Sequence, residues 1–422
     1  MTRDLSKGKK CPNQKISKSK IFVIEFSLRT TCSRAAPRLP PLLALRMSAP
    51  DPPGLGSPLP SPPRDGVSSL CFAQHADLLL VSSWDCSVTL YDVTLRCVRC
   101  AFATREPLLS ACFVDTDAAA SGGLDRTVRL HAFDSTLSEE LGKHGAAVKA
   151  VAHLFRANAV ASAGWDARLR LWDVRTGNNG GGNGRSPSAD LALPGKAFSL
   201  AVSDTLLVVA TAGRRLVAYD VRSLRVESAS SSPLLPPQPP PPLCDRESPL
   251  KHQSRVVSLT PDGHGFALGS TEGRVALDNF GGASGPAPFA WKCHRSVGPD
   301  GTEAVHPVNA LAWHPTTGAL ATGGGDGVVA IWDTTARRRI ASLPPYPTSI
   351  SALSFNADGT MLAVAASYGW EQGEPAATGG TEGGTTEVEG AAPGRLAPMP
   401  PSPPDAVYIR TMAPHEVTPK PR

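Results

Sequence analysis

Two stretches of the chain, SSWDCSVTLYDV (residues 82–93) and SAGWDARLRLWDV (residues 162–174), repeat one pattern. Each begins with small residues, turns tightly at an aspartate and continues as a strand in which apolar residues alternate. A third copy lies between them, and the turn aspartates Asp85, Asp125 and Asp166 are separated by 40 and then 41 residues (125 − 85 and 166 − 125). This spacing indicates one small β-sheet per period of about 40 residues.

The pattern occurs seven times along the chain. The other copies are SGGLDRTVRLHAFD (121–134), TAGRRLVAYDV (211–221), STEGRVALDNF (270–280), TGGGDGVVAIWDT (322–334) and a last copy that begins at AASYGW (365–370) and resumes at AVYIRTM (406–412). One such sheet cannot bury both of its faces alone, so consecutive sheets stack radially. We therefore predict an all-β fold, a seven-bladed WD40 β-propeller.

The segments between the copies predict the domain organisation. The predicted parts are a basic and then proline-rich disordered segment (1–64, with Met47 as an alternative start), propeller blades over 65–373 with flexible inserts at 178–188 and 228–245, a disordered acidic Gly/Pro insert in the last blade (374–404), and a last strand with the C-terminal tail (405–422). The strand that closes a propeller usually comes from the other terminus. Its candidate region, 53–63, is rich in proline, so we expect a short and weak closing strand.

The charge is unevenly distributed. Residues 1–46 hold 11 Lys/Arg against Asp4 and Glu25, a formal charge of +9, and since the whole chain carries +5, residues 47–422 carry −4 (5 − 9). The body of the protein is therefore not expected to bind nucleic acid through bulk charge. The basic head is interpreted as a tail or a transit peptide. No run of 18 apolar residues occurs, so no membrane span is predicted.

No catalytic, cofactor or metal site is predicted. The nine cysteines lack a disulfide framework, and the one CxxC pair, Cys97 and Cys100, has no second pair at zinc-site distance. No phosphate loop or nucleophile-elbow motif occurs, and the glycine-rich stretch 178–184 lacks the lysine of a phosphate loop. Three histidines without metal-ligand spacing are expected to hydrogen-bond within blades: His144, His306 and His314.

Several longer strings resemble a known family. They are DGVSSLCF (65–72), RESPLKHQSR (246–255), WKCHR (291–295), HPVNALAWHP (306–315) and YPTSISALSF (346–355). Together they are similar, in order and over nearly all of the chain after residue 64, to the Bub-family WD-repeat protein of the spindle checkpoint. WKCHR and SYGW also resemble the Rae-type mRNA-export WD protein, whereas YPTSI and LKHQSR favour the checkpoint branch.

The resemblance implies a monomeric adaptor within hetero-complexes, in the nucleus and at the kinetochore, with a cytoplasmic pool. Its implied partners are Bub-type checkpoint kinases, bound through a short acidic motif, and the kinetochore scaffold, bound through phosphorylated Met-Glu-Leu-Thr-type repeats. Neither direct nucleic-acid binding nor membrane binding is expected. The alternatives are an mRNA-export adaptor at the nuclear pore and, by fold analogy, a substrate receptor of a ubiquitin ligase.

Two sets of residues are predicted to bind partners on the top face. Trp84 and Trp165 each precede a turn aspartate, and with Leu124 they would form an apolar peptide anchor; packing between blades is the alternative for the tryptophans. By contrast, Trp172 and Trp332 end strands and are interpreted as structural.

The second set is basic. Arg214 and Arg215 are interpreted as replacing the turn aspartate of the fourth copy, with both predicted to bind the peptide. Lys251 and Arg255 lead into the fifth copy, and together with Arg214 they are predicted to receive a phosphothreonine. A solvated basic edge is the alternative.

Overall fold

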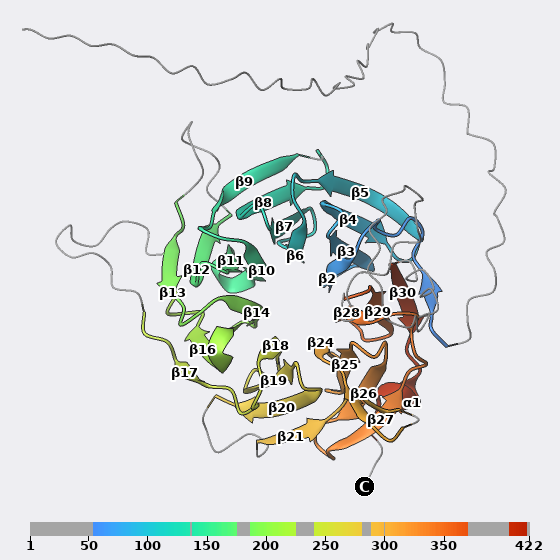
Figure 1. Cartoon of the computed structure of the whole chain (residues 1–422). Coiled ribbons are helices and arrows are strands. Elements are labelled where there is room, and N and C mark those ends of the chain that lie inside the picture. Colours follow the sequence, from blue (N-terminus) through green and yellow to red (C-terminus); the bar gives the residue numbers. More distant parts are fainter. Residues whose placement is uncertain are drawn as a thin grey trace, which may run out of the picture. The chain divides into compact units, whose positions relative to one another are not determined.

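The computed structural model describes residues 54–135, 137–174, 186–224, 240–280, 288–298, 300–369 and 405–419. They belong to one compact unit, Pro50–Arg422. Seven four-stranded antiparallel sheets are arranged around a central axis (Figure 1), which confirms the predicted seven-bladed β-propeller. The first strand of each blade lies nearest the axis and the last lies at the periphery.

The blades are numbered along the chain. Blades 1 to 3 consist of β2 (Val67–Phe72), β3 (Leu78–Ser83), β4 (Ser87–Asp92) and β5 (Cys97–Ala103); β6 (Leu108–Phe113), β7 (Ala118–Gly123), β8 (Thr127–Ala132) and β9 (Ser138–Lys143); and β10 (Val148–Leu154), β11 (Ala159–Gly164), β12 (Arg168–Asp173) and β13 (Ala189–Ala192). Blades 4 to 6 consist of β14 (Ala197–Val202), β15 (Leu206–Thr211), β16 (Arg215–Asp220) and β17 (Cys244–Glu247); β18 (Ser254–Leu259), β19 (Gly265–Ser270), β20 (Arg274–Asn279) and β21 (Phe289–Lys292); and β24 (Val308–Trp313), β25 (Leu320–Gly324), β26 (Val329–Asp333) and β27 (Arg338–Ser342).

Blade 7 closes the ring with a strand from the N-terminal side. Its strands are β28 (Ile350–Phe355), β29 (Met361–Ala366), β30 (Ala406–Thr411) and β1 (Ser57–Pro58). β1 has two residues, with Ser57 opposite Ile409, and the buried side chains of Leu55 and Leu59 flank it. The closing strand is thus as short as the prolines predicted. The ordered structure also starts before Asp65, so residues 54–64 are part of the propeller and not of a disordered tail.

The boundaries of the predicted inserts differ slightly from the structure. β17 begins at Cys244, so the last two residues of the predicted insert at 228–245 already belong to a strand. Ser188, the last residue of the first predicted insert, already donates its N–H to the Leu171 carbonyl at 2.8 Å. The remainder of these inserts (178–185 and 228–239) and the acidic insert (374–404) lie outside the described residues.

Several short elements were not predicted. A two-stranded hairpin, β22 (Arg295–Val297) and β23 (Glu303–Val305), lies between blades 5 and 6, and helix α1 (Pro414–Val417) follows β30. Two single 3₁₀ turns occur at Phe155–Ala157 and Ala212–Arg214. No helix of the described residues is long and apolar enough to cross a membrane.

The core lies between neighbouring blades. Leu169 and Leu171 of blade 3, for example, belong to one buried cluster with Val209 of blade 4. Gly142 shows how closely two blades approach, because a Cβ atom there would lie 2.1 Å from the ring of Trp172 in the next blade. Alternation along the strands therefore buries one face of each blade against its neighbour.

The innermost strands share a backbone irregularity. In all seven, the pairing register shifts around the second residue, which is therefore bulged out of the ladder. The seven bulged residues all line the central cavity: Ser68, Leu109, Lys149, Phe198, Arg255, Asn309 and Ser351.

Candidate functional site on the top face

The top face carries two kinds of connection. One joins the second and third strands of a blade, and the other joins the last strand of a blade to the first strand of the next. A cavity of about 970 Å³ lies on the axis, lined by residues of all seven innermost strands. Such a concave site ringed by loops is where ligands commonly bind on a rigid scaffold.

The turns after the second strands share one backbone hydrogen bond. In blades 1 to 3, the N–H groups of Trp84, Leu124 and Trp165 each donate, at 2.8–2.9 Å, to the carbonyl of the residue before the innermost strand of their blade. The other blades make the same bond from small residues, namely Ala212, Thr271, Gly325 and Ser367. Trp84, Leu124 and Trp165 therefore hold equivalent places on three consecutive blades, and we call them the apolar arc.

The two tryptophans of the apolar arc have different surroundings. Trp84 is 42% exposed and lines the cavity, so its side chain is accessible to a ligand. Trp165 is half-buried, and its indole N–H finds no hydrogen-bond partner among the described residues. Trp172 is 1% exposed and packs in the core, in agreement with its structural interpretation.

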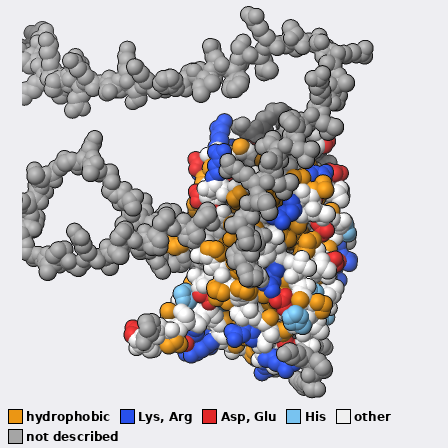
Figure 2. All heavy atoms as spheres, turned by 90° about the vertical axis from the view of Figure 1, so that its right-hand side faces the viewer, with side chains coloured by type: hydrophobic (Ala, Val, Ile, Leu, Met, Phe, Trp, Pro, Cys, Tyr) orange, Lys and Arg blue, Asp and Glu red, His pale blue; other side chains and the backbone are white. Residues whose placement is uncertain are grey.

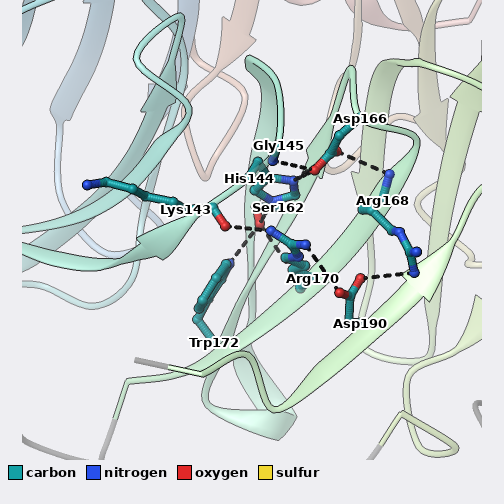
Figure 3. A network of polar contacts seen from close by, with 9 residues as sticks. All are labelled: Lys143, His144, Gly145, Ser162, Asp166, Arg168, Arg170, Trp172 and Asp190. Carbon is teal, nitrogen blue, oxygen red and sulfur yellow. Dashed lines mark hydrogen bonds and ion pairs between the residues drawn. The ribbon is translucent and has the colours of Figure 1, made fainter. Parts of the chain in front are cut away.

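A hydrogen-bond network braces the top of blade 3 (Figure 3). The Nδ1 atom of His144 lies 3.1 Å from Asp166, and its Nε2 atom lies 2.7 Å from the Ser162 hydroxyl. The indole N–H of Trp172 donates to the same hydroxyl at 2.7 Å. A neutral imidazole protonated on Nδ1 satisfies all three contacts. Burial lowers the pKa of His144, which agrees with the neutral form.

Blade 6 repeats this network with a histidine that the sequence analysis did not single out. His294 contacts Asp326 at 2.9 Å through Nδ1 and the Thr322 hydroxyl at 2.8 Å through Nε2. Trp332 donates to the same hydroxyl at 3.1 Å. The sequence signal that could have identified His294 is its distance from the turn aspartate, from HRSV (294–297) to GGGD (323–326). This distance is unusually long because the hairpin β22–β23 lies between His294 and the innermost strand of its blade. The aspartates in these turns are therefore structural residues.

The other histidines also have local roles. His131 takes the place of the tryptophan in blade 2 and lies 2.7 Å from Ser121 and from Ser138. His314 bonds within its own turn, and His306 lies 3.2 Å from Ser296 in the hairpin. No group of three metal-ligating side chains occurs in the described ranges, where Cys97 and Cys100 are free thiols on β5.

The fourth turn corrects the predicted role of two arginines. Ala212 makes the bond that Trp84 makes in blade 1, so Gly213 is at the position of the turn aspartate. Arg214 follows with a positive φ of 60°, as Cys86 does in blade 1 with 67°. Thus neither Arg214 nor Arg215 replaces the aspartate; Arg215 begins β16.

Both arginines already contact acidic side chains of β17. Arg214 pairs with Glu247, and it also donates to the carbonyls of Leu250 and Lys251 at 3.2 and 3.1 Å. Arg215 pairs with Asp245 at 2.5 Å. The structure thus brings Arg214 next to the backbone of Lys251. The charges of Arg214 and Arg215 are at least partly neutralised by Glu247 and Asp245.

The predicted basic residues divide between two places. The side chain of Lys251 is exposed at the rim, whereas Arg255 is a bulged residue that lines the cavity. Blade 5 also contains a pair of cations that the sequence analysis did not identify. Arg274 of β20 lies opposite Lys292 of β21. Arg274 has a weak ion pair with Glu272 at 3.8 Å. Cross-strand neighbours of like charge favour an anion between them.

Comparison with known proteins agrees with this geometry. The family described as WD domain, G-beta repeat matches residues 57–92, 135–173 and 298–333. The mitotic checkpoint protein BUB3.1 of Arabidopsis thaliana is 37% identical over 372 residues, which are 88% of this chain and 96% of the relative. The mitotic checkpoint protein bub-3 of Caenorhabditis elegans is 36% identical over 322 residues, 74% of this chain and 88% of the relative.

A relative with a different name is also similar. The poly(A)+ RNA export protein of Schizosaccharomyces pombe is 30% identical over 320 residues, 74% of this chain and 84% of the relative. Fold, repeats and top-face turns together define a WD-repeat β-propeller protein. Within this class, the chain belongs to the Bub3 family of mitotic checkpoint proteins.

Proposed function

We propose that the chain is a non-catalytic adaptor of the spindle assembly checkpoint. It docks short acidic motifs of Bub-type checkpoint kinases on the apolar arc. It docks phosphorylated Met-Glu-Leu-Thr-type repeats of the kinetochore scaffold on the cations Arg214, Lys251 and Arg255. It acts as a monomeric propeller within larger complexes, in the nucleus and at the kinetochore, with a cytoplasmic pool. Family membership supports the process, and the top-face geometry supports peptide docking.

The exposed indole of Trp84 carries this proposal. A tryptophan that is 42% exposed at the rim of a cavity is poorly explained by folding alone, because burying it would stabilise the fold. Tryptophan is enriched among residues that dominate binding energies. Leu124 and Trp165 hold the equivalent turn positions on the next two blades.

A second candidate function is mRNA export at the nuclear pore. The similarity to the poly(A)+ RNA export protein supports it. The same top face would then dock a nucleoporin peptide. A role as substrate receptor of a ubiquitin ligase is the third reading and rests on fold analogy.

A pull-down with the full chain tests these functions. The wild type, Trp84→Ala and Phe155→Ala are compared; Phe155 is a matched control because it is 69% exposed in a turn on the opposite face. Checkpoint kinases and a kinetochore scaffold should bind the wild type and Phe155→Ala, and bind Trp84→Ala less. Recovery of nucleoporins, or of a cullin adaptor, in their place would contradict the checkpoint role.

A further inference from the structure

Two serines of the chain share a short motif. A serine followed by proline, with Lys or Arg three residues after the serine, occurs in SPPR (61–64) and in SPLK (248–251), and at no other serine or threonine of the sequence. Kinases of the proline-directed class recognise this pattern, because their groove accepts the proline and a negative group of the kinase pairs with the cation. The sequence therefore contains two candidate phosphorylation sites, and their surroundings distinguish them.

The motif at Ser248 is closed by the fold. Ser248 lies in the connection between blades 4 and 5 and is 7% exposed. Its hydroxyl accepts the N–H of Leu250 at 3.2 Å and the hydroxyl of Ser254 at 3.1 Å, and its own N–H donates to the Arg214 carbonyl at 2.6 Å. A kinase needs an accessible hydroxyl in an extended segment, so the folded propeller protects Ser248.

The motif at Ser61 is open to solvent. Ser61 follows the closing strand β1 and is exposed, as are Pro60, Pro62 and Arg64. Its carbonyl accepts the Tyr91 hydroxyl at 2.7 Å, whereas its own hydroxyl has no hydrogen-bond partner among the described residues. β1 lies on the side of the propeller that faces the viewer in Figure 2, where cationic and acidic side chains both reach the surface. The Ser61 hydroxyl is thus available to an enzyme.

The backbone at Ser61 also favours local opening. Its φ of 52° lies in the left-handed region, which residues other than glycine adopt at an energetic cost. A residue that precedes proline prefers the extended region instead. A kinase binds its substrate segment in an extended form. Moving this segment into a kinase groove therefore relieves the strain, which offsets part of the cost of losing the bond with Tyr91.

We infer that Ser61 is a phosphorylation site for a proline-directed kinase that selects a cation three residues after the serine. The Ser61 hydroxyl oxygen attacks the γ-phosphorus of ATP. The new Oγ–P bond forms as the bond from that phosphorus to ADP breaks, and the hydroxyl proton passes to a carboxylate of the kinase. The phosphoserine carries a charge of about −1.5 to −2 at neutral pH.

The added charge lies in the connection that supports the apolar arc. This connection, which follows β1, is tied to the Trp84 turn at two points. The Arg64 N–H donates to Asp85 at 2.9 Å, and the Trp84 N–H donates to the Gly66 carbonyl at 2.9 Å. Asp65 and Asp85 already place negative charge at this corner, and a phosphate increases the repulsion of an acidic peptide that approaches Trp84. Phosphorylation therefore weakens docking of acidic motifs; this consequence rests on the proposed function.

Treatment of the folded full chain with a cyclin-dependent kinase and ATP tests the site, and mass spectrometry maps the phosphate. Ser61 should be phosphorylated nearly completely, and Ser248 should stay unmodified. Synthetic peptides covering 59–67 and 246–253 are the matched controls; both should be phosphorylated, because both motifs are accessible outside the fold. An unmodified Ser61 in the folded chain, equal modification of Ser248 there, or an unmodified 59–67 peptide would each overturn the inference.

A substitution tests the selection of the cation. Arg64→Ala should slow phosphorylation of Ser61 about tenfold, because a charge-assisted contact with the kinase is lost. Lys251→Ala is the matched control and should leave this rate unchanged. Equal rates in Arg64→Ala and the wild type would overturn the assignment to this class of kinase.

A binding experiment tests the consequence for docking. The phosphorylated wild type is compared with kinase-treated Ser61→Ala, using an acidic peptide derived from a checkpoint kinase. The phosphorylated protein should bind about two- to fivefold more weakly, and the difference should shrink with added salt. Equal affinities would overturn the effect on docking. If the peptide binds neither protein, the proposed function fails, while the mapped phosphate still decides the modification site.

Discussion

His144 and Asp166 meet at 3.1 Å although they come from different connections, one before the innermost strand of blade 3 and one after its second strand. The carboxylate also accepts the Gly145 N–H at 2.8 Å, so it joins the two connections into one rigid corner (Figure 3). The equivalent contact of His294 with Asp326 does the same in blade 6. These corners hold the top-face turns in place.

The first prediction concerns this corner. Asp166→Ala should lower the free energy of unfolding by about 1–3 kcal/mol, because it leaves the buried His144 N–H without an acceptor. Asp85→Ala is the matched control, since Asp85 occupies the same turn position and also accepts a backbone N–H from the preceding connection, that of Arg64 at 2.9 Å, but bonds the Ser87 hydroxyl at 2.6 Å instead of a histidine. Denaturant titration measures both variants. An equal loss in both would show that the histidine contact contributes nothing beyond the turn itself.

The second prediction concerns pH. Burial lowers the pKa of His131 to about 4, whereas the unfolded chain titrates near its ordinary value of 6.5. Between these values the unfolded state binds a proton that the native state does not, so stability is complete above about pH 6.5 and falls as the pH drops toward 4. The loss should reach about 3 kcal/mol. His131→Gln should flatten the pH dependence of unfolding by that amount; an unchanged slope would contradict it.

The third prediction separates two tryptophans. Trp84→Ala should weaken binding of a kinase peptide by about 2 kcal/mol or more and leave thermal stability nearly unchanged, because its side chain is exposed. Trp172→Ala should instead destabilise the fold by about 3–5 kcal/mol, since Trp172 is fully buried. Calorimetry and thermal melts give both quantities. Equal losses of binding and stability in Trp84→Ala would place Trp84 in the core.

The fourth prediction concerns the phosphate site. Arg214→Glu with Lys251→Glu should abolish binding of a phosphorylated Met-Glu-Leu-Thr-type peptide, and the affinity of the wild type should fall with salt. The cross-strand cations Arg274 and Lys292 are the alternative residues for binding the phosphate, so Arg274→Glu with Lys292→Glu is tested in parallel. Calorimetry compares phosphorylated and plain peptides. If the Arg214/Lys251 variant still prefers the phosphopeptide, those residues are not the reader; loss in the other variant alone would assign Arg274 and Lys292.

The fifth prediction concerns ring closure. A truncated chain that starts at Ser61 lacks residues 54–60, and with them β1 and the buried Leu55 and Leu59. Its melting temperature should be several degrees lower than that of the full chain. The truncation also removes the Leu55 carbonyl that accepts the Tyr346 hydroxyl at 3.0 Å. A chain starting at Pro50 is the control and should melt like the full chain. Equal melting of the two truncations would show that β1 does not contribute to closure.

The sequence predicted the blades because each repeat carries its own turn chemistry. Asp85, Asp125 and Asp166 mark turns whose geometry depends on a few neighbouring residues, so a periodic pattern is sufficient. The exposed position of Trp84 followed from its place before such a turn.

Long-range partners could not be predicted in this way. Asp245 and Glu247 neutralise Arg215 and Arg214, but a proline-rich insert separates them in sequence, so only the ladder between β16 and β17 reveals the pairing. The turn of blade 4 contains Gly213 where others have an acid, and a shift of one residue was enough to misplace two arginines. The pairing of His294 with Asp326 is also a long-range contact, because the hairpin β22–β23 separates the two residues in sequence.

The repeated bulge of the innermost strands also has a consequence for how such a molecule can diversify. Because each bulge moves one residue out of the ladder, that residue faces the cavity. Asn309 also donates to the Ile350 carbonyl of the next blade at 3.0 Å, so this position contributes to the scaffold as well. The chemistry of the axis can therefore change one blade at a time: polar side chains appear in Ser68, Asn309 and Ser351, and charged ones in Lys149 and Arg255. Selection on partners and selection on folding thereby act largely on separate positions of the same strand.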